Sequence, residues 1–189
     1  YDYIFRCTEM AGKIVHIPRV LYHWRVHSAS TADNPASKLY AYEAGKKAIE
    51  GNLARCGEEG TVTLRSDYGF YDVDYKLQGT PLVSILIPNK DQADTLRTCL
   101  ESIKKKCMYP SYEILIIENN STEEATFSYY KELEAQGIRV LKYPKQGFNY
   151  SAINNFGVKE AKGEYLLFLN NDMEIITPDF MEKMVSNLQ

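Results

Sequence analysis

The strongest constraint on the fold is a regular alternation of strand and helix patterns from Pro81 to the end of the chain. Four short apolar runs have the composition of buried strands, and they cover residues 82–87, 113–117, 138–143 and 164–169. Between them, apolar residues recur at the i, i+3, i+4, i+7 spacing of a helix face, as in Leu96, Cys99, Leu100 and Ile103. Apolar strands that alternate with helices are typical of a mostly parallel sheet covered on both faces. We therefore predict a Rossmann-like α/β fold for this half.

Local signals also predict where the helices of this half begin and end. Ser121 followed by Glu124 has the form of a capping box, so a helix is expected to begin there. Gly163 is expected to end the helix that runs through Ile153. Thr177 is expected to be the N-cap of the last helix, with Pro178 in its first turn.

Residues 1–80 lack this alternation and predict a smaller α+β segment. Their pattern favours a short first helix and an amphipathic helix over residues 36–55. Strict alternation predicts a hairpin between residues 61–64 and 70–77. Residues 13–27 are predicted to form two strands interrupted by Pro18.

Composition excludes several classes of protein. The formal net charge of −3 and the isoelectric point near 5.7 argue against a nucleic-acid binder, which normally has a basic face. No apolar segment approaches the roughly 20 residues that a membrane helix needs. The four cysteines, at positions 7, 56, 99 and 107, have no C-x-x-C spacing. They predict reduced thiols rather than a disulfide framework, a zinc site or a nucleophile.

Polar side chains follow three of the four predicted strands. They are Asn89, Lys90 and Asp91 after the first strand, Glu118, Asn119 and Asn120 after the second, and Asn170, Asn171 and Asp172 after the fourth. The carboxyl ends of parallel strands meet at one edge, where such sheets bind ligands. One acidic residue at a loop start is commonly a helix cap. Three clusters on the same edge instead predict a ligand site.

The second half resembles a known family in four segments. "PLVSILIPNKDQADTLRTCLESI", "YEILIIENNST", "FNYSAINNFGVKEAKGEYLLFLNND" and "ITPDFMEKM" are similar to the amino-terminal half of a family 2 glycosyltransferase, in order and over residues 81–189. Within that family they are most similar to bacterial enzymes that build surface polysaccharides. The segments "YDYIFR" and "GKIVHIPRVLYHWRVHSAST" resemble the carboxy-terminal end of such a domain.

This resemblance implies a division into three parts. Residues 1–58 would be the tail of an upstream transferase domain with a linker helix, and residues 59–80 a hairpin linker. Residues 81–189 would be the nucleotide-sugar-binding half of a GT-A domain. The catalytic base is then expected outside the chain, which alone is expected to transfer nothing. A half-domain also exposes apolar surface. A homo-oligomer, or packing of the two parts of one chain, is therefore left open.

The resemblance also implies the chemistry. Family members move a sugar from a nucleoside diphosphate donor to a hydroxyl of a saccharide or lipid-linked acceptor. The diphosphate leaving group is usually neutralised by a divalent cation, Mg²⁺ or Mn²⁺. The expected location is the cytoplasm, including the inner face of the membrane.

The resemblance assigns roles to particular residues of the rim. Asn170 stands in the first acidic place of the family's D-x-D strand and Asp172 in the last, so these two are the expected metal ligands. An asparagine in the first place should weaken the metal site. Glu118 would accept a hydrogen bond from the base or ribose, and His27 resembles a histidine that approaches the metal. The residues expected to bind the nucleotide sugar are Pro88, Asn89, Asp91, Glu118, Asn120, Asn149, Asn155, Asn170, Asn171 and Asp172.

Two other classes of protein remain as alternatives. A nucleotidyltransferase would normally show a Gly-rich basic loop after the first strand, and "PNKDQAD" contains no glycine. A non-catalytic α/β nucleotide-binding or interaction module would use the polar residues of the rim only as helix caps. A nucleotide that stabilises the chain together with a divalent cation would separate these possibilities.

Overall fold

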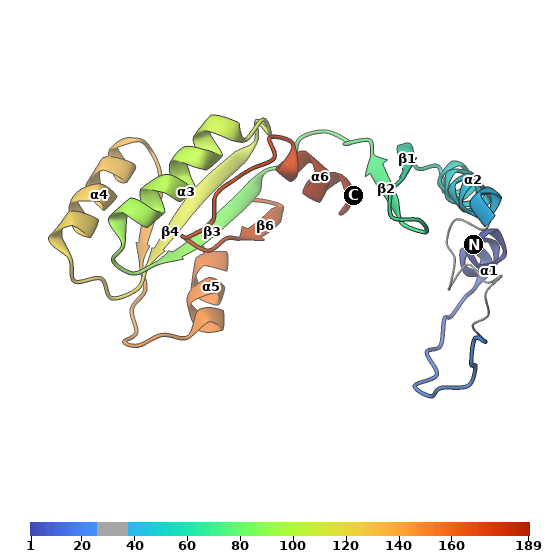
Figure 1. The fold of residues 1–189 in the computed structure, drawn as a ribbon. Helices are drawn as coiled ribbons and strands as arrows, with labels where there is room; N and C mark the ends of the chain where they lie inside the picture. The colour runs from blue at the N-terminus through green and yellow to red at the C-terminus, as the bar shows by residue number, and fades with distance from the viewer. Residues whose placement is uncertain (26–37) are drawn as a thin grey trace. The chain divides into compact units, whose positions relative to one another are not determined.

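A computed structural model describes residues 1–25 and 38–189 of the chain (Figure 1). The described residues form two compact units, Tyr1–Lys76 and Leu77–Gln189, which we call unit 1 and unit 2. Among the described residues, no helix combines the length and apolar character needed to cross a membrane.

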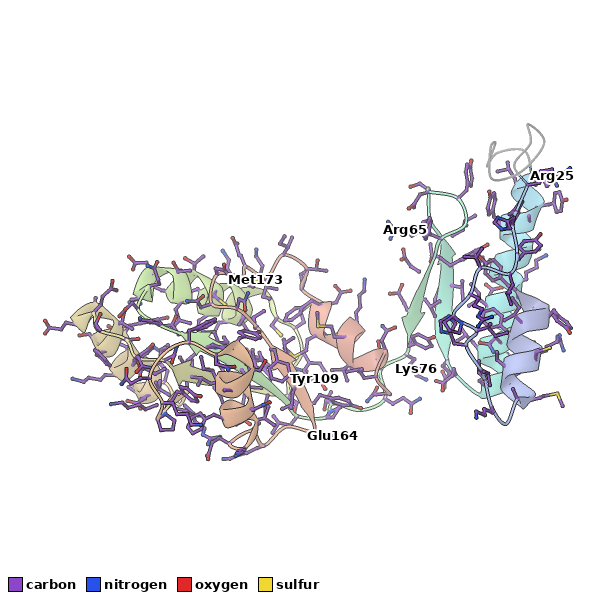
Figure 2. All side chains as sticks on the ribbon, turned by 90° about the horizontal axis from the view of Figure 1, so that it is seen from below. Arg25, Arg65, Lys76, Tyr109, Glu164 and Met173 are labelled. Carbon is purple, nitrogen blue, oxygen red and sulfur yellow. The ribbon has the colours of Figure 1, made fainter. Side chains whose placement is uncertain are left out.

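Unit 1 consists of two helices and a hairpin. Helices α1 (Asp2–Met10) and α2 (Leu39–Cys56) contact each other, and the Arg55 guanidinium binds the Glu9 carboxylate between them at 2.8 Å. Strands β1 (Gly60–Leu64) and β2 (Tyr71–Tyr75) pair as the predicted antiparallel hairpin. Figure 2 marks Arg65, which directly follows β1, and Lys76, which directly follows β2.

The two strands predicted between residues 13 and 27 are absent from the described part of that segment. Residues 11–25 contain no helix or strand, and their apolar side chains, including Trp24, are exposed. The Arg19 N–H donates to the Ile17 carbonyl oxygen at 2.8 Å, so the backbone turns at Pro18. Proline cannot donate to a strand ladder, which disfavours a strand through residue 18. The prediction was wrong for these residues, and His27 lies outside the described ones.

Unit 2 is built on a four-stranded sheet in which every pair of neighbours is parallel. Its strands are β3 (Val83–Asn89), β4 (Tyr112–Glu118), β5 (Arg139–Lys142) and β6 (Tyr165–Phe168), in the spatial order β5-β4-β3-β6. The chain therefore builds outward from β3 to β5 and then returns to the other side of β3. The border between β3 and β6 is the topological switch point, where such sheets bind ligands. The predicted Rossmann-like sheet is confirmed.

Helices cover both faces of this sheet (Figure 1). Helices α3 (Ala93–Lys106) and α4 (Glu124–Ala135) lie on one face, and α5 (Tyr150–Val158) lies on the other. Helix α6 (Phe180–Ser186) joins the larger core cluster through Met181 and Val185. Alternate strand residues point to opposite faces, so Ile116 belongs to the larger cluster and Ile117 to the smaller one under α5. Tyr109, marked in Figure 2, is fully buried and donates to the Pro81 carbonyl oxygen at 2.6 Å.

The end of α5 and the start of α6 differ from the predictions. Helix α5 ends at Val158, so Gly163 does not terminate it. Gly163 instead lies against β3, where an added Cβ would be 2.6 Å from the Ser84 backbone nitrogen. Helix α6 begins at Phe180 with Asp179 as its N-cap, so Thr177 is not the cap. The close approach of residue 163 to β3, rather than the end of a helix, therefore explains why this residue is a glycine.

Candidate functional site

The polar residues that follow β3, β4 and β6 lie together at the carboxyl edge of the sheet. Asn89 ends β3 and pairs in register with Glu118, which ends β4. On the other side of β3, the Asn171 Nδ2 donates to the Asn89 Oδ1 at 2.7 Å. The three clusters therefore meet around the switch point. We call residues 88–91, 118–122 and 170–172 the polar rim.

Asn89 lies at the centre of the rim and is only 2% exposed. Its Nδ2 donates to the Tyr130 hydroxyl at 2.7 Å and to the Asp91 carbonyl oxygen at 2.9 Å. Its Oδ1 accepts from Asn171. Both amide hydrogens and the amide oxygen are therefore used within the protein. Asn89 holds other rim residues in place, while Pro88 before it is half-buried and pairs with Ile117.

The loop after β4 is held by the side chain of Glu118, which is 4% exposed. The Glu118 Oε1 accepts from the Ser121 N–H at 2.6 Å. Asn120 has a φ of 61°, in the left-handed region that asparagine tolerates better than most residues. Its Nδ2 donates to the Lys145 carbonyl oxygen at 3.0 Å. The loop therefore has a defined conformation, and the Glu118 carboxylate keeps further capacity to accept hydrogen bonds.

Asp91 joins the loop after β3 to the loop after β4. Its Oδ1 accepts from the backbone N–H groups of Thr122 at 2.7 Å and Glu123 at 2.9 Å. The Asp91 N–H donates to the Ser121 Oγ at 2.9 Å. The predicted capping box is therefore wrong, because α4 begins at Glu124 with Glu123 as its N-cap. The Asp91 carboxylate, from another loop, therefore takes the place of a local cap. Because it is charged, its hydrogen bonds are stronger than those that a neutral serine hydroxyl would make.

The backbone hydrogen bonds from Glu123 and Thr122 lower the pKa of the Asp91 carboxyl. Since the folded-state pKa lies below that of the unfolded chain, ionised Asp91 stabilises the fold above about pH 4, and this stabilisation is lost as pH falls through the folded-state pKa. In Asp91→Ala we expect the Thr122 and Glu123 amides to exchange with solvent on the order of tenfold faster at neutral pH. Hydrogen exchange followed by NMR measures this.

Asp94→Ala is the matched control for that measurement. Asp94 is exposed in the first turn of α3, and its carboxylate accepts neither of the two amides. Its substitution should leave their exchange unchanged. Equal exchange in wild type and Asp91→Ala would show that Asp91 does not hold the loop.

The residues after β6 present the most accessible oxygens of the rim. Asn170 and Asp172 are exposed, whereas Asn171 is half-buried and held by Asn89. Beneath them, the Cys99 thiol lies 3.8 Å from the Asn170 carbonyl oxygen. Burial raises the pKa of Cys99 to about 11, so the thiol stays protonated at neutral pH. Cys99 is a small buried side chain here, as its place on the apolar helix face predicts.

The oxygen donors after β6 fit a hard divalent cation. Asp172 offers a carboxylate and Asn170 an amide oxygen. Within residues 1–25 and 38–189, no group of three or more His, Cys, Asp or Glu side chains could hold an ion by itself. Such a sparse donor set suits a cation that takes most of its ligands from phosphate oxygens and water, as Mg²⁺ commonly does.

The asparagines of α5 have unequal surroundings. Asn149 is the N-cap, and its Oδ1 accepts from the Ala152 N–H at 3.0 Å. Asn155 is exposed. Asn154 is buried and donates to the Tyr150 carbonyl oxygen, while its Oδ1 has no hydrogen-bond partner among the described residues. The Asn149 side chain is thus committed to the helix, and Asn155 is available to a ligand.

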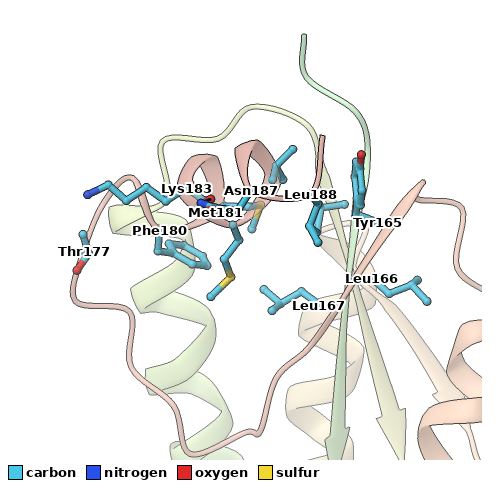
Figure 3. A pocket seen from close by; sticks show the side chains of 12 residues that line it. Tyr165, Leu166, Leu167, Thr177, Phe180, Met181, Lys183, Asn187 and Leu188 are labelled. Atoms are coloured by element: carbon cyan, nitrogen blue, oxygen red, sulfur yellow. Dashed lines mark hydrogen bonds between the residues drawn. The ribbon is translucent and has the colours of Figure 1, made fainter. Parts of the chain in front are cut away.

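Two hollows in unit 2 differ in character. One of about 250 Å³ adjoins the rim, and its lining residues are Glu118, Phe127, Tyr130, Lys131, Glu134, Val140 and Lys142. A larger groove of about 730 Å³ lies between β6 and α6 (Figure 3). In Figure 3 the side chains of Leu167, Phe180 and Met181 face into it, while Leu166 points away. This groove is mostly apolar and contains none of the polar-rim residues, so its size does not make it the candidate site.

Tyr130 is the rim partner that the sequence pattern does not reveal. It recurs with Phe127 and Leu133 on one helix face, which predicts a core residue. The ring does pack edge-on against Phe127, with centroids 6.1 Å apart. Its hydroxyl, however, bonds Asn89 and lies 3.4 Å from the Ser121 Oγ. The one available signal is chemical, because a buried tyrosine hydroxyl usually has a partner.

Comparison with known families decides how this rim is to be interpreted. The sequence profile described as "Glycosyl transferase family 2" matches residues 84–189, which is more than half of the chain and includes every residue of the rim. The chain belongs to glycosyl transferase family 2. The parallel sheet and its helices are accordingly the GT-A type of α/β fold.

Individual relatives agree with this family. The O-antigen biosynthesis protein RfbC of Myxococcus xanthus is 41% identical over all 189 residues. The putative glycosyltransferase EpsH of Bacillus subtilis is 31% identical over 108 residues, which is 56% of this chain. The chain spans 15% of the length of RfbC and 30% of that of EpsH.

One solved structure supports the fold assignment. The mannosyltransferase PcManGT from Pyrobaculum calidifontis, in complex with GDP-Man and Mn²⁺, is 16% identical, with a TM-score of 0.50. The match covers 80% of this chain and 42% of that one. At this identity the likeness concerns the fold alone.

Proposed function

We propose that the polar rim binds a nucleoside diphosphate sugar together with a divalent cation, as the donor site of a glycosyltransferase. The observation that carries this proposal is the meeting of three polar clusters at the switch point of a family 2 sheet. Ligands of such sheets bind at this place. A non-catalytic module would need none of the exposed oxygens that remain after β6.

The cation is proposed to be held by Asp172 and Asn170. When bound, it would neutralise the charge that develops on the diphosphate leaving group. The amide oxygen of Asn171 is proposed to accept a hydrogen bond from the ribose, because its Nδ2 is fixed on Asn89. PcManGT, whose structure contains GDP-Man and Mn²⁺, makes Mn²⁺ a suitable first metal to test.

The nucleoside is proposed to lie at the other end of the rim. Glu118 lines the 250 Å³ hollow and keeps free acceptor capacity, so it would accept from an N–H of the base or from a ribose hydroxyl. Pro88 and Asp91 would lie under the base, and Asn120 and Asn155 would flank the diphosphate. Asn149 would act through the helix that it caps.

Transfer would break the bond between the sugar's anomeric carbon and the diphosphate and form one to the acceptor oxygen. The acceptor proton must go to a base. Glu118 and Asp91 are poor candidates for that role, since their carboxylates already accept backbone N–H groups. We therefore propose donor binding, and not proton transfer, as the task of these residues.

The acceptor is proposed to be a saccharide or a lipid-linked saccharide in bacterial surface polysaccharide synthesis, by analogy with RfbC. Unit 1 is proposed to be the tail of a preceding transferase domain with its linker. The match to RfbC runs through both units, whereas the match to EpsH covers about half of the chain. A cytoplasmic location would suit the four free cysteines.

Calorimetry tests the proposal directly. We expect one of UDP, GDP or dTDP, with Mn²⁺, to raise the melting temperature of the chain. At a nucleotide concentration 100 times Kd, binding to the native state adds about 2.7 kcal/mol to the free energy of unfolding. The same nucleotide in EDTA should give a much smaller shift, since the diphosphate then loses its cation.

Adenosine and Mn²⁺ alone are the controls for this experiment. Neither provides a cation-bridged diphosphate, so both should leave the melting temperature nearly unchanged. If none of the three nucleotides stabilises the chain with either Mn²⁺ or Mg²⁺, the donor-site proposal is wrong and the interaction-module alternative is favoured.

A further inference from the structure

A continuous set of hydrogen bonds connects the two ends of the polar rim through a residue outside it. Tyr130 on α4 is 4% exposed, and its hydroxyl accepts from the Asn89 Nδ2 at 2.7 Å. The same hydroxyl lies 3.4 Å from the Ser121 Oγ. Asn89 in turn accepts from Asn171, beside Asp172, and Ser121 donates to Glu118. Both ends of the rim therefore lie within two hydrogen bonds of one phenol.

The orientation of the Asn89 amide follows from its partners. The Asp91 carbonyl oxygen can only accept, so the amide nitrogen of Asn89 must face it. The Tyr130 hydroxyl takes the second amide hydrogen, which leaves the Oδ1 on the side of Asn171. The Asn171 Nδ2 then has to donate to the Asn89 Oδ1, so the Asn171 Oδ1 is the atom that remains for a ligand. Tyr130 and the Asp91 carbonyl together determine which end of Asn171 a ligand meets.

We propose that Tyr130 is a positioning residue of the donor site, which orients Asn171 through Asn89 and steadies the Glu118 loop through Ser121. This inference rests on the proposed donor site. It concerns nucleotide affinity, since the Tyr130 hydroxyl is engaged with protein groups and reaches the ligand only through them.

Removing only the hydroxyl isolates this role. Tyr130→Phe keeps the ring against Phe127 and leaves one buried donor of Asn89 without its partner. We expect the Asn89 and Asn171 amides then to sample other orientations. The Kd of the stabilising nucleotide with Mn²⁺ should rise about fivefold to tenfold, the usual effect of losing one buried hydrogen bond.

The preceding residue provides a matched control. Tyr129 lies on the same helix and is also 4% exposed, but its ring packs under the Arg97 guanidinium at 4.0 Å. Tyr129→Phe should change the nucleotide Kd by less than about twofold, because among the described residues its hydroxyl makes no hydrogen bond with Asn89 or Ser121. An equal loss in both variants would indicate a general weakening of α4 and would overturn the inference.

A double-substitution cycle separates positioning from packing. If Tyr130 acts through Asn171, then Tyr130→Phe in an Asn171→Ala background should raise the Kd by less than about twofold further. A full fivefold to tenfold effect in that background would overturn the orientation of Asn171 by Tyr130. It would leave only the contact of the hydroxyl with Ser121 as a route to the site.

NMR of the side-chain amide groups gives a readout that does not need a ligand. In the wild-type chain the Asn89 and Asn171 NH₂ protons should exchange slowly with solvent, and in Tyr130→Phe they should exchange faster and change chemical shift. If Tyr130→Phe does not fold, fast exchange at Asn171 in the wild type would overturn the inference and slow exchange would support it.

The outcomes distinguish this inference from the proposed function. Nucleotide binding in wild type with equal affinity in Tyr130→Phe would overturn the positioning role and leave the donor site standing. Absence of binding by UDP, GDP and dTDP in wild type would remove both.

Discussion

Asp172→Ala should abolish most of the metal-dependent binding of the nucleoside diphosphate. Asp172 is the one carboxylate among the three residues that follow β6, and it is exposed where a ligand can reach it. Losing one partner of a close charge contact in a binding site commonly costs about 2–5 kcal/mol, which weakens binding at least about 30-fold. Titration calorimetry should show a weaker nucleotide affinity in the presence of Mn²⁺. In the absence of Mn²⁺, wild type and Asp172→Ala should bind the nucleotide alike.

Two comparison variants make the result specific to position 172. Glu174→Ala removes an exposed carboxylate two residues along the same loop, one that pairs with Lys106 in the free protein. It lowers the negative charge equally and should leave nucleotide affinity nearly unchanged. If Glu174→Ala and Asp172→Ala weaken binding alike, the effect is one of net charge and Asp172 is not a ligand.

Asn170→Asp is the converse change. It adds a second carboxylate to the same short segment, and affinity for hard divalent cations rises with the number of charged ligands. Mn²⁺ affinity should increase on the order of tenfold, and most strongly when nucleotide is bound. A decrease would show that the amide of Asn170 does something that a carboxylate cannot do, such as donating a hydrogen bond.

The strands of unit 2 were predictable because buried parallel strands are apolar over their whole length. The side chains of a run such as Leu82–Ile87 point alternately to both faces of a sheet, so they are all buried only where both faces are covered. Their carboxyl ends must share an edge, so the meeting of Asn89, Glu118 and Asn171 could be predicted without coordinates. The order β5-β4-β3-β6 could not be derived from periodicity, since it depends on which neighbour each strand pairs with.

Two of the errors concern tertiary contacts that a local pattern does not specify. Ser121 has the local form of a cap, but Asp91, thirty residues earlier, binds the amides before α4. The segment around Pro18 alternates like a strand, but its described residues pair with none. Local pattern specifies what a residue is able to do, and tertiary contacts then select among those options.

Burial within the rim was the least predictable feature. Polar residues at strand ends are expected to be accessible, yet Asn89 and Glu118 are almost fully buried. The hydrogen-bonding capacity of Asn89 is used within the protein, because an unpaired buried polar group is costly, whereas the Glu118 carboxylate accepts from the Ser121 N–H and keeps further acceptor capacity. The rim thus divides into accessible groups, chiefly Asn170 and Asp172, and supporting groups beneath them. Sequence alone gives both kinds the same appearance.

Gly163→Ala should destabilise unit 2 by about 2–3 kcal/mol, near the upper end of what overpacking by one methyl group usually costs. An added Cβ would lie 2.6 Å from the Ser84 backbone nitrogen and 2.8 Å from the Leu82 carbonyl oxygen. The first belongs to the backbone of β3 and the second to the residue just before β3, and backbone cannot move aside as a side chain can. The Gly163 N–H also donates to the Ser84 Oγ at 2.8 Å, so displacing this residue removes a hydrogen bond as well.

Gly157→Ala is the informative comparison, since it adds the same methyl group in the same unit. Its Cβ would meet the Ile117 Cδ1 and, at 2.6 Å, the Leu86 Cδ2, which are the ends of buried side chains and can shift more readily than the backbone of β3. It also gains about 1 kcal/mol of helix propensity within α5. We therefore expect Gly157→Ala to destabilise unit 2 less than Gly163→Ala.

Hydrogen exchange of peptides covering β3 and β6 is the suitable measurement. Tryptophan fluorescence would not report on unit 2, because the only tryptophan, Trp24, lies in unit 1. Similar losses for both glycines would mean that the approach of Gly163 to β3 is looser than the structure has it, and that β6 is held chiefly by its own side chains.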